Sequence, residues 1–564
     1  MMSLKKEIKN LLEELADLME FKGENVFKVN AFRNGARTIG MLEDDIEIMI
    51  KDDSIMNIKG IGKGLLAVIY EYYNTGKSSQ YDDLVKEVPL SVLDLFKIKG
   101  LGAKKIRLLF DELKIDSIGK LEISAKNNEL AEVKGLGGKT QEKILAEIKR
   151  IKKSAGFILL SLALTKAEII KKEFESLDSS VEVYITGALR RRREVVSSME
   201  FLIVAENDEK FLASLNSLYG YKKLEENKFY TSYSIEMNEA AKVIVYITTP
   251  KNQFYSLFQT TGAREFTIEL EIKDEISTGS EEVIFKQADF PYVIPEMREV
   301  EYLTAPEALK TNSDLELKDF KGFFHFHTTE SDGHNSLAEM IAEIERNGFE
   351  YAAVCDHSKS AFYAHGLTED RILQQRALID ELNSKNSFYV YHGIESDILK
   401  DGKLDYDDDV LKQFHFIVAS IHSNFNMTEE EMTKRIITAI ENPYTDLIAH
   451  PTGRLLLARD SYPVNIKKVI DACAVNKVAI EINANPHRLD LDWRHLYYAR
   501  EKGCLIGINP DAHSIDGVSD INYGIMMARK GGVQKKDVIN CLNENDFINF
   551  INRKTNRLNR EVKK

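Results

Sequence analysis

The sequence predicts a multidomain protein in which a helical region, a small α+β domain and a C-terminal β/α barrel follow one another. Three observations support this organisation: a glycine-centred motif that occurs three times before residue 155, alternating apolar runs between about residues 181 and 290, and twelve histidines that all lie between residues 325 and 513. At 564 residues the chain exceeds the length at which a single hydrophobic core stops growing, so several domains are expected.

The composition is that of an ordinary globular protein, with 43% hydrophobic and 29% charged residues. Its longest apolar runs fall short of the roughly 18 residues of a membrane span. The four cysteines lack C-x-x-C spacing, which fits a reducing compartment. The net charge is −14, although residues 1–155 are nearly balanced, with 27 Lys and Arg against 25 Asp and Glu. We therefore expect a cytoplasmic protein without membrane attachment, and no feature indicates an obligate protein partner.

The helical region, residues 1–155, contains the motifs "IKGIGKGLLAVI", "IKGLGAKKIRLL" and "VKGLGGKTQEKIL". In each motif a G-x-G turn opens a helix whose N-terminal N–H groups and dipole favour an anion. Flanking lysines can contact further phosphates without reading sequence. Taken singly, such a turn is ordinarily structural, but three in similar settings favour nucleic-acid contact. The expected contact residues are Gly60, Gly62, Gly100, Gly102, Lys104, Lys105, Gly135, Gly137 and Lys139.

The next region, residues 156–300, is predicted to be α+β because the runs "VEVYIT", "FLIVAE", "KVIVYITT" and "EEVIFKQ" read as strands. Three of the ten prolines, Pro291, Pro295 and Pro306, lie at its end. They predict a stiff, extended linker over residues 301–318. The last domain then covers residues 319–564.

In the last domain, seven strand-like runs are "KGFFHFH", "YAAVCDH", "FYVYHGIE", "FHFIVASIH", "TDLIAH", "VAIEINAN" and "CLIGINPDAH". Six of them end in His, Asp or Glu, and parallel barrel strands open their C-terminal ends onto one mouth. A lone histidine is usually a satisfied core residue, but nine candidates at corresponding positions favour a metal site for Mn, Zn or Fe. These are His325, His327, Asp332, His357, Glu395, His422, His450, Asp511 and His513.

The motifs "HFHTTESDG", "VCDHS", "GIESDIL", "SIHS", "AHPTGR", "EINANPHRLDL" and "PDAHS" resemble the polymerase-and-histidinol-phosphatase (PHP) domain. The order of domains resembles bacterial family X DNA polymerases, and "NVFKVNAFRNGARTI" is similar to the N-terminal domain of that family. The resemblance covers essentially the whole chain. It implies a helix-hairpin-helix region, a nucleotidyltransferase-like palm and thumb at 156–300, and a distorted seven-stranded PHP barrel.

The resemblance also implies a centre of three divalent metals that hydrolyses phosphoesters. One metal would be held by His325, His327, Glu395 and Asp511, the residues expected to be catalytic. A second would be held by Glu395, His422 and His450, and a third by Asp332, His357 and His513. Metals placed in this way activate water and neutralise phosphoester oxygens.

The stretch "YITGALRRRREVVSSMEFLIVAE" resembles the family segment G-S-x-R-R followed by G-D-x-D on a strand. Arg190 and Arg191 occupy the two arginine positions of that segment and are expected to contact phosphate. A run of four arginines, however, is more often a solvated surface. The two aspartate positions, however, are Ser198 and Glu200, and the third aspartate corresponds to Ile244. Because Mg²⁺ is commonly bound through carboxylates, we expect the polymerase site to be degenerate.

The leading hypothesis is a metal-dependent DNA phosphoesterase, a 3′–5′ exonuclease or end-processing enzyme of repair. It would bind gapped or single-strand-containing DNA through the backbone. Three alternatives remain open: a small-molecule phosphatase of the histidinol-phosphate type, an active family X repair polymerase, and a non-catalytic DNA-binding scaffold.

Overall fold

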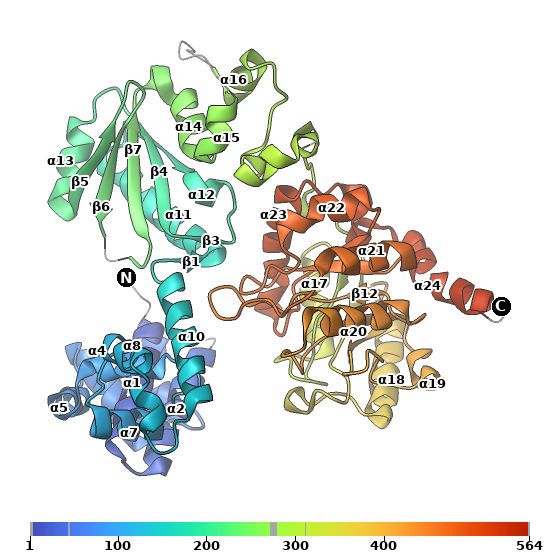
Figure 1. Cartoon of the computed structure of the whole chain (residues 1–564), viewed down its shortest axis with the longest axis horizontal. Helices are drawn as coiled ribbons and strands as arrows, with labels where there is room; N and C mark the ends of the chain where they lie inside the picture. The colour runs from blue at the N-terminus through green and yellow to red at the C-terminus, as the bar shows by residue number, and fades with distance from the viewer. Residues whose placement is uncertain (1–3, 43–45, 238, 271–278, 311, 562–564) are drawn as a thin grey trace. The chain divides into compact units, whose positions relative to one another are not determined.

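The computed structural model describes residues 4–42, 46–237, 239–270, 279–310 and 312–561 (Figure 1). Contacts divide the chain into two compact units, Met1–Ala155 and Gly156–Lys564. The division falls at the first predicted domain boundary. In the part of the chain that is described, no helix combines the length and the apolarity needed to cross a bilayer.

The first unit is helical and packs around its first helix. Apolar residues Ile8, Leu12, Leu15 and Met19 recur on one face of that helix and are fully buried. The helices are α1 (Leu4–Lys22), α2 (Val26–Met41), α3 (Ile46–Lys51), α4 (Lys63–Thr75), α5 (Ser79–Glu87), α6 (Leu93–Phe96), α7 (Ala103–Leu113), α8 (Ile118–Lys126), α9 (Glu129–Glu132) and α10 (Gly138–Ser154).

The three glycine-centred motifs of this unit share one backbone geometry. Their first glycines have φ values of 99°, 91° and 96°, a region that side chains disfavour. Their second glycines are the N-caps of α4, α7 and α10, and no side chain caps these helices. The first-turn N–H groups are thus left for a ligand or water. The glycine pairs are Gly60 and Gly62, Gly100 and Gly102, and Gly135 and Gly137.

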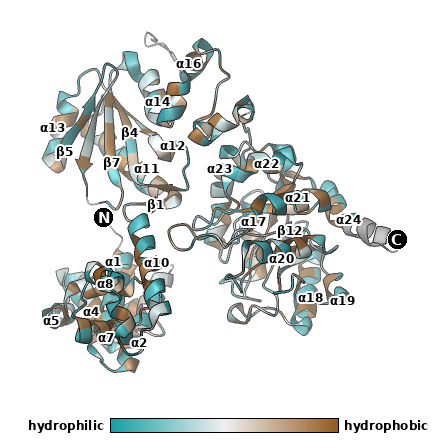
Figure 2. Ribbon diagram, viewed as in Figure 1, coloured by the Kyte–Doolittle hydropathy of each residue, from teal (hydrophilic) through white to brown (hydrophobic). Residues whose placement is uncertain are grey.

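The second unit begins with a five-stranded sheet of order β2-β4-β7-β6-β5, in which only the β4–β7 pair is parallel. Its apolar face packs on α11 and α13, where Phe174 makes edge contacts with Phe201 and Phe211. Figure 2 shows the apolar residues along β4 and β7. The elements are β1 (Ile158–Leu159), α11 (Leu160–Leu177), β2 (Glu182–Thr186), α12 (Gly187–Arg190), β3 (Val195–Val196), β4 (Ser198–Val204), α13 (Glu209–Leu218), β5 (Gly220–Glu226), β6 (Thr231–Glu236), β7 (Lys242–Thr248), α14 (Gln253–Thr261), α15 (Arg264–Glu269) and α16 (Glu281–Gln287).

Two predictions about local structure in this unit are wrong. The run "EEVIFKQ" forms helix α16 instead of a strand, because burying Glu281, Ile284 and Phe285 together requires helical spacing. A short apolar run does not distinguish the two structures by periodicity. Residues 301–318 are also not an extended linker. The described part of this segment contains 3₁₀ turns at Val300–Thr304, Pro306–Lys310 and Leu317–Asp319, and Tyr302, Leu309 and Leu315 along it are buried.

The rest of the second unit is a parallel barrel of seven strands in the order β14-β13-β12-β11-β10-β9-β8, and all seven predicted strands are present. The edge strands approach each other through a bridge between Phe326 and Ala512, so the barrel is nearly closed. The strands are β8 (Gly322–Phe324), β9 (Tyr351–Val354), β10 (Tyr389–Asp397), β11 (Phe416–Ser420), β12 (Leu447–Ile448), β13 (Ala479–Asn483) and β14 (Ile506–Asn509).

The inside of the barrel is filled at one end by its last helix. The ring of Phe547 stacks on Phe324 at 4.8 Å and lies 5.8 Å from Phe416. With that end plugged, polar side chains gather at the C-terminal ends of the strands, as in other β/α barrels. The helices are α17 (Leu337–Arg346), α18 (Glu369–Lys385), α19 (Asp408–Leu411), α20 (Glu429–Glu441), α21 (Ile466–Asn476), α22 (Leu496–Glu501), α23 (Ile521–Lys530) and α24 (Glu544–Glu561).

Candidate metal centre

All nine predicted ligands lie close together at the C-terminal mouth of the barrel. Glu395 is within β10, and the others follow β8, β9, β11, β12 and β14. Their potential ligand atoms form four groups in which all atoms are within 4.8 Å of one another. The groups are His327, Asp332, His357 and His513; His325, His327 and Asp511; His325, Glu395 and His450; and His357, Glu395 and His422.

Glu395 is the centre of this arrangement and is 1% exposed. Its Oε1 is 3.1 Å from Nε2 of His450, 3.3 Å from Nε2 of His325 and 3.4 Å from Nε2 of His422. Its Oε2 is 2.8 Å from Nδ1 of His357. The same Oε2 is 3.7 Å from Nε2 of His327. One carboxylate therefore faces five imidazoles, which is the position of a bridging ligand.

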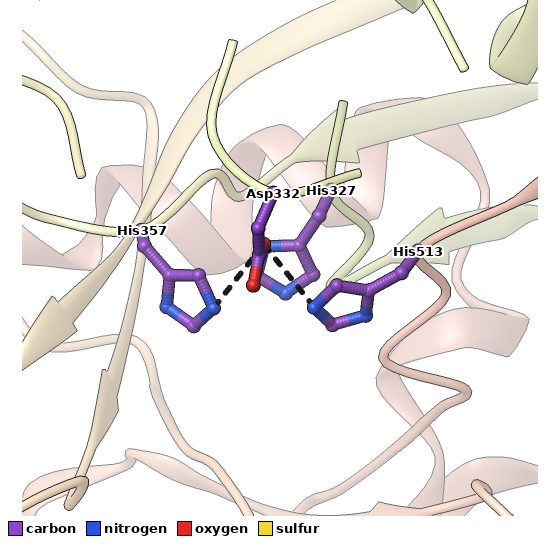
Figure 3. Close-up of side chains that lie close together, drawn as sticks. All are labelled: His327, Asp332, His357 and His513. Carbon is purple, nitrogen blue, oxygen red and sulfur yellow. Dashed lines mark ion pairs between the residues drawn. The ribbon is translucent and has the colours of Figure 1, made fainter. Parts of the chain in front are cut away.

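Asp332 lies between the side chains of His357 and His513 (Figure 3). Its Oδ1 is 3.3 Å from Nε2 of His513 and 3.6 Å from Nε2 of His357. The ring of His327 stacks between these imidazoles, with centroid distances of 4.2 Å to His513 and 4.4 Å to His357. Asp332, His357 and His513, the three residues predicted to hold a third metal, thus lie together in one group. The assignment of ligands to individual ions stays a prediction.

Two carboxylates that the sequence analysis did not select orient these histidines. Glu481 of β13 accepts a hydrogen bond from Nδ1 of His325 at 2.6 Å, and Asp397 of β10 accepts one from Nδ1 of His422 at 2.6 Å. Each bond turns the opposite nitrogen, Nε2, toward Glu395. Carboxylates behind ligand histidines fix the ring and its tautomer. The signal for Glu481 was a glutamate in the middle of an otherwise apolar strand, "VAIEIN".

The chemistry of these side chains fits a divalent cation. Nε2 of His325, Nδ1 of His357 and Oε2 of Glu395 are buried without a hydrogen-bond partner in the described residues. Buried polar atoms normally have such a partner, so a shared bound ion accounts for these exceptions. Imidazole and carboxylate ligands together suit transition metals.

The ionisation of the two buried carboxylates also suits a cation. Burial by itself would raise the pKa of Glu395, but His357, His422 and His325 hold the pKa of this carboxyl well below its usual range. Asp511 is likewise held well below its usual pKa, against burial, chiefly by His325. Burial lowers the pKa of His327 to about 3, so this imidazole is neutral near pH 7. At His325, His422 and His513 the neighbouring carboxylates outweigh burial and raise the pKa, to about 10 for His422 and to about 9 for His513. Metals bind ionised carboxylates and neutral imidazoles, so these three histidines would release protons when a metal binds.

Three of the nine residues have unusual backbone conformations. His325, His450 and Asp511 have φ values of 52°, 28° and 56°. A residue other than glycine in this region costs on the order of 1–3 kcal/mol, and such residues cluster at functional sites. The backbone is thus strained just after β8, β12 and β14, where it positions ligand side chains at the mouth of the barrel.

The predicted polymerase positions lie on one face of the five-stranded sheet. Glu200 of β4 is directly opposite Ile244 of β7 in the strand register. Oε1 of Glu200 accepts a hydrogen bond from Ser198 at 2.7 Å, and Oε2 accepts one from Tyr246 at 2.9 Å. Burial and the charge of Glu200 raise the pKa of Tyr246, so its hydroxyl remains a donor. Among the described residues, no group of potential metal ligands includes Glu200.

The arginine run pairs with carboxylates of the same unit. Arg190 forms an ion pair with Glu281 at 2.6 Å and donates to Thr261. Arg191 pairs with Glu299 at 3.1 Å and donates to the carbonyl of Thr261 at 2.6 Å. Both charges are thus balanced within the protein, and contact of either arginine with DNA stays a prediction.

The lysines of the hairpins are placed differently. Lys104 and Lys139 are exposed, next to the N-termini of α7 and α10. Lys105 is half-buried, and its Nζ donates to the carbonyl of Gly100 at 3.0 Å, so it supports the turn itself. Contact of these residues with DNA was inferred from the motif and stays a prediction.

Comparison with known proteins agrees with this architecture. A helix-hairpin-helix domain model matches residues 3–78. The chain is 35% identical to the "DNA polymerase/3′-5′ exonuclease PolX" of Bacillus subtilis (strain 168) over 97% of its own length and 99% of that protein. It is also 31% identical over 34% of its length to a "probable phosphatase" of Caldicellulosiruptor bescii, covering 78% of that protein. A similar "probable phosphatase" of Acetivibrio thermocellus is 28% identical, over 42% of this chain and 97% of the relative.

The match to the Bacillus protein extends over both units of this chain, whereas the matches to the two phosphatases each cover less than half of it. Helix-hairpin-helix motifs, a nucleotidyltransferase-like sheet and a seven-stranded parallel barrel with clustered His, Asp and Glu side chains follow one another in the expected order. The chain therefore belongs to the PolX family, the bacterial family X DNA polymerases that end in a PHP domain.

Proposed function

We propose that this protein is a metal-dependent DNA phosphoesterase that removes nucleotides from 3′ ends, and that its polymerase activity is lost. The observation that carries the proposal is the contrast between its two sites. The barrel mouth assembles nine ligand side chains around Glu395, whereas the sheet face offers one glutamate whose two oxygens already accept hydrogen bonds.

In the barrel, the nine side chains would hold two or three divalent cations, such as Mn, Zn or Fe. Bound there, the cations would activate water and stabilise the charge that develops on a phosphoester. The chain's own contribution is positional. Glu481 and Asp397 fix the imidazoles of His325 and His422, and Glu395 supplies the negative charge that several cations can share.

At the sheet, the polymerase site lacks the ligands that two magnesium ions need. Ser198 has a neutral hydroxyl and Ile244 has no ligand atom, so only Glu200 carries charge. Magnesium requires near-octahedral oxygen coordination, which one glutamate cannot provide for two ions. We therefore infer that the sheet keeps the palm fold and binds the DNA without extending it.

The DNA substrate is inferred from the first unit and from the relative. Three hairpins with uncapped helix N-termini are suited to phosphate contact, and the Bacillus relative is named as a 3′–5′ exonuclease. A second candidate, a small-molecule phosphatase, is favoured by the matches to probable phosphatases. It would leave the hairpins and the sheet without a role.

The test is a primer assay with 5′-labelled DNA, single-stranded or annealed across a gap, incubated with the protein and Mn²⁺ in the presence and absence of nucleotides. The primer is expected to shorten in both conditions. Release of phosphate from histidinol phosphate, with intact DNA, would favour the phosphatase.

The loss of polymerase activity is tested by Glu200→Ala in the same assay. This variant is expected to shorten the primer at the wild-type rate, because Glu200 is assigned to no catalytic step. Template-dependent extension by the wild type that Glu200→Ala abolishes would contradict the proposal and show an active polymerase.

A further inference from the structure

Two large aromatic side chains stand exposed beside the metal centre. Phe362 and Tyr363 open a 3₁₀ turn, Phe362–Ala364, in the loop that follows the ligand His357. Phe362 is 86% exposed and Tyr363 is 68% exposed. Single exposed apolar residues are ordinary, but here two consecutive aromatic residues are exposed in the loop that follows a ligand. We call these two side chains the aromatic rim.

The loop that carries the aromatic rim is held in place by its backbone. The amide of Ser360 donates to Asp405 at 2.7 Å, and the amide of Lys359 donates to the hydroxyl of Tyr406 at 3.1 Å. The same hydroxyl of Tyr406 donates to the carbonyl of Leu367 on the far side of the turn. The aromatic rim is thus exposed on a loop whose backbone is anchored on both sides of the turn.

Tyr363 lies next to two different groups of ligands. Its ring centroid is 6.2 Å from that of His357 and 6.4 Å from that of His422. His357 and His422 both face Glu395, so a phosphoester bound at the centre would lie beside the tyrosine ring. The aromatic rim is therefore within reach of the group that is attached to the reacting phosphate.

The side chain of Arg488 adds a positive charge next to the ligand Asp511. Nε of Arg488 is 3.6 Å from Oδ2 of Asp511, and the guanidinium makes no hydrogen bond that the described part of the chain records. A guanidinium is planar and can bind phosphate oxygens through two N–H groups. The mouth thus combines a group that favours a phosphate with an aromatic ring beside the ligands. A nucleotide has both complementary groups, a phosphate and a flat base.

We propose that the aromatic rim stacks on the base of the terminal nucleotide and makes the barrel selective for strand ends that carry a base. This inference rests on the proposed function, since it names what the site recognises in its DNA substrate. Stacking on an aromatic side chain tolerates any base, because every base has a π-face. The aromatic rim would therefore select a nucleoside end without selecting a sequence.

The experiment uses the full chain with Mn²⁺ and two single-stranded 5′-labelled DNAs that differ only at the 3′-terminal residue. One ends in thymidine and the other in its abasic tetrahydrofuran analogue. The variants are the pair Phe362→Ala with Tyr363→Ala, the conservative Tyr363→Phe, and Tyr389→Ala as matched control. Tyr389 is a tyrosine exposed at the opposite end of the barrel, at the start of β10.

For the double variant, kcat/KM on the thymidine end is expected to fall by about 10- to 100-fold, the usual effect of removing an aromatic stacking partner. Its kcat/KM on the abasic end should equal that of the wild type. Tyr363→Phe should keep the preference for the thymidine end, because the ring is retained, and Tyr389→Ala should match the wild type on both substrates.

Equal loss on both ends would overturn the proposal, because it would show damage to the metal centre. Unchanged rates on both ends would also overturn it and leave the aromatic rim as a surface for another partner. If Tyr363→Phe behaved like the double variant, the hydroxyl and not the ring would be the active group, contrary to the proposal. A wild type that cleaves neither end would contradict the proposed function itself, and the inference with it.

Discussion

Glu481 shows how a residue that touches no substrate shapes the metal centre. It is fully buried in β13 and accepts hydrogen bonds from His325, from Asn509 at 2.9 Å and from the backbone amide of His450 at 2.8 Å. It therefore connects two ligands that approach Glu395 from different strands. Without its charge, the imidazole of His325 would lose the partner that fixes its tautomer.

We predict that Glu481→Gln lowers metal affinity or the cleavage rate by about 10- to 100-fold, the usual effect of removing such a partner. The measurement is a metal titration of the apoprotein together with the rate of primer shortening. Asp446→Asn is the matched control, since Asp446 is a buried carboxylate at the start of β12, at the opposite end of the barrel. Equal loss in the control would indicate a general effect on folding.

At the scale of single elements, the hairpins place their lysines unequally around each turn. Lys99 and Lys104 of the second hairpin are exposed, whereas Lys105 bonds back to Gly100. An exposed lysine next to a free helix N-terminus can neutralise a phosphate and release its counterion. Lys105 is instead expected to matter for the shape of the turn.

We predict that replacing Lys99 and Lys104 by Gln weakens DNA binding and lowers the slope of log affinity against log salt by about 0.9 per lost phosphate contact on duplex DNA. Affinity is measured by fluorescence anisotropy over a range of salt concentrations. Lys86 and Lys120, exposed lysines of the same unit outside the hairpins, provide the control pair. A slope that stays unchanged would assign Lys99 and Lys104 to the solvated surface.

The sequence predicted those elements that depend on local spacing. The seven barrel strands and the three hairpins follow from short motifs in which each residue has a local reason for its position. Helix α16 was missed because a short apolar run does not distinguish a helix from a strand, and because the burial of Glu281 in it depends on Arg190 and Arg298, which lie outside this helix. The partners of the arginine run and the roles of Glu481 and Asp397 likewise arise from pairing between separate elements, which no local pattern records.

At the scale of the whole second unit, buried charges join the five-stranded sheet region to the barrel. Glu299 is 2% exposed and pairs with Arg191 at 3.1 Å, Arg193 at 3.4 Å and Lys530 of α23 at 2.6 Å. The indole of Trp493 donates to Glu194 at 3.2 Å in the same region. The arginine run thus contributes to holding residues 156–564 together as one unit.

We predict that Glu299→Gln destabilises this unit by about 3–5 kcal/mol, because the buried Lys530 and the half-buried Arg191 and Arg193 lose their shared counter-charge. In calorimetry of the full chain, the transition of the second unit should shift to lower temperature while that of the first unit stays in place. Glu226→Gln, at an exposed position of β5, is the control. A shift no larger than that of the control would show that the network contributes little to stability.

The central claim is that chemistry lies in the barrel and DNA binding in the preceding domains, and Glu395→Gln tests it most directly. This substitution keeps the shape of the side chain but removes the charge that faces five imidazoles. The measurement pairs the cleavage rate with DNA affinity for the wild type and the variant, with bound metal counted by elemental analysis. We predict that cleavage falls by orders of magnitude and the metal content drops, while DNA affinity is unchanged. Full cleavage at a reduced metal content would contradict the account and place the chemistry elsewhere in the chain.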